Sequence, residues 1–75
     1  MKQEDENLTL QVVGKLIEIR RSLNLTQEDV RFDTGLNIGR IESGKHMPSL
    51  RTITKLLKYY DNMPLDEFFK GIQYD

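Results

Sequence analysis

The sequence predicts a compact all-α domain built from five helices. Three observations lead to this expectation: apolar residues recur at helical intervals of three and four, residues typical of helix starts and ends separate five such runs, and no strand signal lies between them. A chain of 75 residues can bury one modest core. It contains no cysteine, so its stability must come from helix packing or from dimerisation.

The first helix is expected to run from Leu8 or Thr9 to about Asn24. Its apolar face is formed by residues at helical spacing, namely Val12, Val13, Leu16, Ile17, Ile19 and Leu23. Residues 1–7 show no such periodicity. We therefore expect them to form a flexible N-terminal tail that precedes the folded domain.

The second helix is short and begins after Thr26. A threonine hydroxyl caps the free backbone N–H groups at a helix start, and the acidic residues that follow favour the positive end of the helix. Val30 and Phe32 are its candidate interior positions. Gly35 ends it, since glycine readily adopts the left-handed backbone conformation that is common after a helix.

The third helix is very short, with Ile38 and Ile41 on one side and Gly44 after its end. Ser49 follows a proline and is a good cap for a fourth helix. The apolar positions of that helix recur at regular helical spacing and are Leu50, Ile53, Leu56, Leu57 and Tyr60.

A fifth helix closes the chain and begins near Pro64, because proline suits a first helical turn. Its apolar positions are Leu65, Phe68 and Phe69. The folded helical domain is therefore expected to span residues 8–71, and residues 72–75 are expected to form a short C-terminal tail.

The charged residues are distributed unevenly along the chain. The formal net charge is −1, yet the stretch from Leu8 to Tyr60 carries nine basic against five acidic side chains, and the excess acid lies at the two ends. A basic middle suits an anionic partner such as nucleic acid. An ordinary solvated surface would carry the same pattern.

Other classes of protein find little support in the composition. The acidic, polar start differs from a secretory signal, and no apolar run reaches the roughly 20 residues that span a membrane, so we expect a cytoplasmic protein. His46 is the only histidine and lacks cysteine partners, which argues against a metal site. No nucleophile with a neighbouring base and no cofactor loop is evident. We expect neither an enzyme nor a bound cofactor or small-molecule ligand.

Several motifs occur in an order that resembles a known family. A helix that ends near Asn24 is followed by Thr26-Gln27-Glu28, then a turn glycine, then Ile41-Glu42-Ser43-Gly44-Lys45, then Pro48-Ser49-Leu50. This order resembles the Cro/Xre helix-turn-helix family of phage-type repressors, from about Val12 to Phe69. The resemblance implies a phage-repressor-like fold that binds double-stranded DNA.

The resemblance also implies roles for individual residues. The recognition helix would lie at about residues 36–43 with its N-terminal part in the major groove. Arg40 would read a base, because its guanidinium can donate two hydrogen bonds to a guanine edge, and Arg20 would form a structural ion pair with Glu42. The implied DNA-binding residues are Gln27, which would lie over a phosphate, together with Thr34, Leu36, Asn37, Gly39, Arg40, Ser43 and Lys45.

The sequence departs from the family pattern in the turn region. Gly35 and Glu42 are only seven residues apart, which is shorter than the family pattern. Either Thr34 caps a full recognition helix, or Asn37 caps a helix of only two turns and its side chain is occupied by the backbone. Arg31 stands where the family prefers a small alanine. Gly39 would compensate if it allowed close approach of a helix or of DNA.

Two functions remain open from the sequence. The first is a small transcriptional regulator, expected to be a repressor, that binds as a homodimer to a twofold-symmetric operator with half-sites about one helical turn apart. Four aromatic residues flanking the last linker cannot all point inward, and an exposed patch there would suit the dimer surface. These are Tyr59, Tyr60, Phe68 and Phe69. The alternative is a protein-interaction module on the same fold, such as an antitoxin-like or co-regulator partner with weak or no specific DNA binding.

Overall fold

The computed structural model describes residues 2–73, and within them it contains five helices and no strand. The helices are α1 (Lys2–Ser22), α2 (Gln27–Thr34), α3 (Ile38–Ile41), α4 (Leu50–Tyr59) and α5 (Leu65–Phe69). The prediction of an all-α domain with five helices is confirmed. None of the helices described is both long and apolar enough to cross a membrane.

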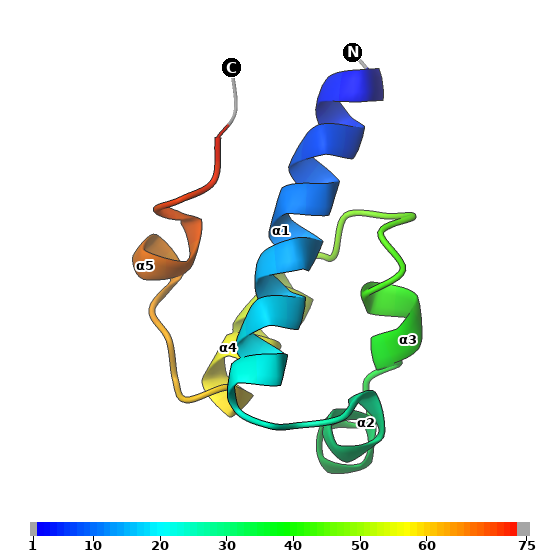
Figure 1. The fold of residues 1–75 in the computed structure, drawn as a ribbon, viewed down its shortest axis with the longest axis vertical. Coiled ribbons are helices and arrows are strands. Elements are labelled where there is room, and N and C mark those ends of the chain that lie inside the picture. The colour runs from blue at the N-terminus through cyan, green and yellow to red at the C-terminus, as the bar shows by residue number, and fades with distance from the viewer. Residues whose placement is uncertain (1, 74–75) are drawn as a thin grey trace.

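Helix α1 runs along the long axis of the molecule, with α5 on one side and the α2–α3 pair on the other (Figure 1). Its inner face meets residues from all four other helical segments in one apolar core. The buried residues of this core are Val12, Leu16, Val30, Ile38, Ile53, Leu56, Leu57, Tyr60, Phe68 and Ile72. The core therefore fixes α2 and α3 against the C-terminal half of α1.

Helix α1 begins earlier than the sequence predicted. It starts at Lys2 rather than at Leu8 or Thr9, so residues 2–7 are helical where we expected a tail. Glu6 and Asn7 are exposed, and glutamate, glutamine and lysine in this stretch are good helix formers. Apolar periodicity detects a buried face and not helicity itself, which is why it missed this turn. Met1, also assigned to the tail, lies outside the described residues.

The helix ends follow the predicted capping signals closely. Thr26 caps α2, where its hydroxyl accepts from the Asp29 amide (3.0 Å) and the Asp29 carboxylate accepts from the Thr26 amide (2.9 Å). These hydrogen bonds lower the pKa of Asp29. Ser49 caps α4 in the same way, through the amide of Thr52 at 3.1 Å. Gly35 follows α2 with a φ of 77°, in the left-handed region.

Two residues at the C-terminus belong to the folded part and not to a tail. Ile72 is buried in the core. Gln73 exchanges two hydrogen bonds with the side chain of Gln11 on α1, at 2.6 and 2.8 Å. The predicted boundary at residue 71 is therefore too early. Tyr74 and Asp75 lie outside the described residues.

The aromatic side chains are arranged differently from the prediction. Tyr60 and Phe68 are fully buried, and Tyr59 and Phe69 pack against the core while partly buried. The Tyr59 hydroxyl also donates a hydrogen bond to the carboxylate of Asp33, which ties α4 to α2 and raises the Tyr59 pKa. None of these four rings is exposed, so the expected exposed aromatic patch on the C-terminal helices is wrong for the residues named.

Among the described residues, the exposed aromatic residue is instead Phe32 on α2. Its side chain is 88% exposed, although the sequence made it a candidate for the interior. Helix α2 has only eight residues and buries one apolar residue, Val30. Phe32 lies two positions further along, so the helical rotation turns it away from the core.

Candidate nucleic-acid interface

The turn between α2 and α3 decides between the two alternatives left open by the sequence. Thr34 lies in the last turn of α2, where its hydroxyl donates to the Val30 carbonyl (2.7 Å) and accepts from the Leu36 amide (3.1 Å). The side chain of Asn37 accepts from the Arg40 amide at 3.1 Å and caps α3. Asn37 is thus the cap of a shortened helix, and Thr34 shapes the turn before it.

Helix α3 contains four residues and turns two isoleucines toward the core. Ile38 is buried and Ile41 packs against the core from a partly buried position. Gly39 and Arg40 are exposed on the outer side. Leu36, which the resemblance placed among the DNA-binding residues, is not exposed beside them. It is partly buried against the core, because the short turn draws the chain inward directly after Gly35.

A buried ion pair holds the end of α3 to the end of α1, as the resemblance implies. The Arg20 guanidinium donates to both carboxylate oxygens of Glu42, at 2.7 and 3.0 Å. The two side chains are only 8% and 4% exposed. A third nitrogen of Arg20 donates to the Leu25 carbonyl at 2.7 Å. Hydrogen bonding to Glu42 raises the pKa of Arg20, so the guanidinium stays charged throughout the usual pH range.

Gln27, the first residue of α2, joins the same carboxylate. Its amide nitrogen donates to Glu42 at 2.8 Å, so one carboxylate connects α1, α2 and α3. The resemblance placed Gln27 over a phosphate. An amide group carries two hydrogens, and the bond to Glu42 uses one of them while orienting the group at the exposed start of α2.

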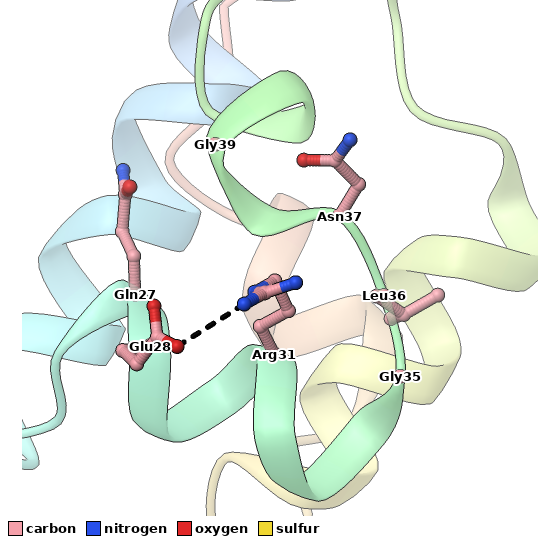
Figure 2. Close-up of a pocket in the computed structure, with 7 residues that line it drawn as sticks. All are labelled: Gln27, Glu28, Arg31, Gly35, Leu36, Asn37 and Gly39. Atoms are coloured by element: carbon pink, nitrogen blue, oxygen red, sulfur yellow. Dashed lines mark hydrogen bonds and ion pairs between the residues drawn. The ribbon is translucent and has the colours of Figure 1, made fainter.

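An open hollow of about 430 Å³ lies between α2 and α3. Figure 2 shows the residues around it, which are Gln27, Glu28, Arg31, Gly35, Leu36, Asn37 and Gly39. A Cβ added to Gly39 would come no closer than 3.7 Å to Gln27 and 3.8 Å to Asn37. Close helix packing is therefore not the reason for a glycine here. A Cβ at this position would make ordinary van der Waals contacts.

Arg31 enters this hollow from α2. Its guanidinium makes a 3.1 Å ion pair with Glu28 one turn earlier, and the two side chains are 60% and 78% exposed. Sequence comparison marked Arg31 only as a departure from a small residue and assigned it no role. Its place beside Asn37 and Gly39 makes it a functional candidate that the sequence reasoning missed (Figure 2).

The loop after α3 carries the last two residues that the resemblance implies. The Ser43 hydroxyl donates to the Arg40 carbonyl (2.7 Å) and accepts from the Lys45 amide (3.3 Å). Gly44 between them has a φ of 78°, and a Cβ there would meet Leu10 at 3.0 Å. Ser43 therefore shapes a turn that only glycine fits, and Lys45 lies exposed beyond it.

Comparison with known proteins agrees with this geometry. No curated protein and no solved structure is significantly similar to the chain. A family model described as helix-turn-helix matches residues 16–68, which is more than half of the chain and includes α2, the turn and α3. The protein therefore belongs to the Cro/Xre helix-turn-helix family of DNA-binding domains.

Proposed function

We propose that this protein binds duplex DNA in a sequence-directed manner as a small transcriptional regulator that acts as a repressor. The observation that carries the proposal is the orientation of α3. Ile38 and Glu42 anchor it from the inside, and Arg40 is exposed on its outer side. A short helix fixed in this way can enter a major groove without reorganising, because its outer side chains are already presented.

Some of the exposed residues would contact DNA bases, and others would contact the phosphate backbone of the DNA. The Arg40 guanidinium has the two-pronged geometry that matches the acceptors of a guanine edge. Lys45, beyond the end of α3, and Gln27, at the start of α2, would contact phosphates on either side. Asn37 contributes less than the resemblance implies, since its side-chain oxygen is committed to the Arg40 amide.

Repression would follow from occupancy of an operator in the cytoplasm by a homodimer. A twofold-symmetric site doubles the contacts of one small domain and raises both affinity and specificity.

One observation favours the protein-interaction alternative. Phe32 is 88% exposed on α2, and exposed aromatic side chains are enriched where partner proteins bind. The short α3 would also make fewer base contacts than a longer recognition helix. In this alternative the partner is a protein that covers Phe32, and DNA binding is weak and unspecific.

Selection of bound sequences from a random duplex pool separates the two functions. It should be run with the wild type, with Arg40→Ala, and with Lys70→Ala as a control. Lys70 is an exposed cation at the end of α5, and α5 lies across α1 from α2 and α3 (Figure 1). We expect an enriched half-site in the wild type and the control, with one position lost in Arg40→Ala. If no sequence is enriched and weak binding vanishes at physiological salt, the proposed function is wrong and the interaction module is favoured.

A further inference from the structure

The starting point is the part of the recognition helix that is absent. Because α3 begins after Asn37 and has four residues, it lacks the turn that would extend its N-terminal end toward the groove. The open hollow between α2 and α3 lies beside this end, and Asn37 and Gly39 line it. A longer recognition helix would present its base-reading side chains from this region.

Arg31 is the long basic side chain that reaches this region. It rises from α2 into the space between α2 and the segment that carries Asn37 (Figure 2). Gly39 lines the same hollow and has no side chain, so no side chain of α3 projects into the hollow at that position.

The contact that holds Arg31 is easily exchanged. Its ion pair with Glu28 joins two side chains that are 60% and 78% exposed, and exposed pairs of this spacing contribute little to stability. In contrast, Arg20 is buried with Glu42 and cannot leave without unfolding the site. Arg31 can therefore exchange Glu28 for another acceptor. In the unbound protein, Glu28 neutralises its charge and accepts one hydrogen bond from its guanidinium.

We propose that Arg31 is a specificity-determining residue that reads a base edge in the major groove, in place of the missing turn of α3. The inference rests on the proposed DNA-binding function and adds a second reader, from α2, to Arg40. The guanidinium fork donates two hydrogen bonds to the two acceptors of a guanine, which the single ammonium group of lysine cannot match in geometry. Glu28 acts as its competitor in the free protein.

The test compares sequence selection and titrations on the selected duplex for wild type, Arg31→Ala, Arg31→Lys and Glu28→Gln, with Lys70→Ala as the charge control. Arg31→Ala should lose preference at one base pair that Arg40→Ala retains, with a loss of about 5- to 150-fold in discrimination there. Arg31→Lys should keep the salt dependence of binding but not that preference. Glu28→Gln should bind the same sequence more tightly, by up to about 5-fold. Circular dichroism checks that all variants are folded, which the exposure of both side chains predicts.

Three results would overturn the inference while leaving the proposed function intact. If Arg31→Ala weakens binding equally on every sequence and lowers the salt slope by about 0.9, Arg31 neutralises a phosphate and reads no base. If Arg31→Lys retains the base preference, the fork is not the reader. If the wild type selects a sequence that Arg40→Ala changes and Arg31→Ala does not, the proposed function stands and Arg31 has no part in it. If the wild type selects no sequence at all, both the proposed function and the role of Arg31 are refuted.

Discussion

Replacing Glu42 with alanine tests whether the buried ion pair holds the domain together. The carboxylate accepts hydrogen bonds from two nitrogens of Arg20 and from Gln27, at 2.7, 3.0 and 2.8 Å. Without it, the Arg20 guanidinium stays buried with the Leu25 carbonyl as its recorded acceptor. An uncompensated buried charge costs about 3–5 kcal/mol, and a core of this size supplies about the same amount in total. We therefore expect Glu42→Ala to be largely unfolded at 25 °C.

Urea unfolding at pH 7, followed by far-ultraviolet circular dichroism, measures the effect. Two further variants keep the comparison quantitative when the alanine variant does not fold. Glu42→Gln preserves the shape of the side chain and removes its charge, so its free energy of unfolding should lie between those of the wild type and Glu42→Ala. The double variant Arg20→Met with Glu42→Leu removes both charges, and its free energy of unfolding should return to that of the wild type or exceed it by about 1–4 kcal/mol.

Two outcomes would refute this reasoning. A Glu42→Ala protein within about 1 kcal/mol of the wild type would mean that the pair behaves like an exposed one. A double variant as unstable as the single one would mean that side-chain packing at these positions, and not the unpaired charge, causes the loss.

Three further predictions concern the core, the turn and the exposed aromatic residue. Burial raises the pKa of Tyr60 to about 12, above the value of about 10 in an unfolded chain. The free energy of unfolding should therefore be constant below pH 10 and fall by about 1.4 kcal/mol per pH unit between pH 10 and 12, because only the unfolded chain loses the proton there. Urea midpoints that stay constant over this window would contradict the prediction. Gly39→Ala should raise the thermal midpoint, with a gain of up to about 1 kcal/mol, because the added Cβ meets nothing nearer than 3.7 Å. Gly35→Ala should lower the thermal midpoint, with a loss of about 1–2 kcal/mol in the free energy of unfolding, because φ is +77° there. Equal midpoints for the two glycine variants would show that backbone conformation does not matter. Phe32→Ser should change the free energy of unfolding by less than about 0.5 kcal/mol, whereas Phe68→Ala should cost about 3–5 kcal/mol; similar urea curves for the two would disprove the assigned burial.

The parts of the fold that the sequence predicted depend on local chemistry. Thr26 and Ser49 each cap a helix through a backbone amide three residues later, and such signals need no knowledge of the rest of the chain. Asn37 belongs to this group as well, since glycine, apolar residue and cap occur in order at the turn. For this reason the sequence alone offers the shortened α3 as one of two alternatives.

The parts that sequence reasoning missed depend on tertiary packing. Leu36 and Phe32 are both apolar and close in sequence, yet one packs against the core and the other is 88% exposed. A helix of eight residues followed by a tight turn offers too few positions for periodicity to separate them. Ile72 was missed because its burial requires the chain to fold back along α1, as the Gln11–Gln73 hydrogen bonds record. Arg31 gave a signal only as a departure from a small residue.

The division of α3 into an inner and an outer side has an evolutionary consequence. Ile38 and the carboxylate of Glu42 make the buried contacts that hold this segment in the fold. The exposed residues Gly39, Arg40 and the neighbouring Arg31 contribute little to these contacts. Mutations can therefore accumulate at the outer positions without loss of the fold. Descendants of this chain could acquire new operators through a handful of substitutions, while the scaffold that presents them stays the same.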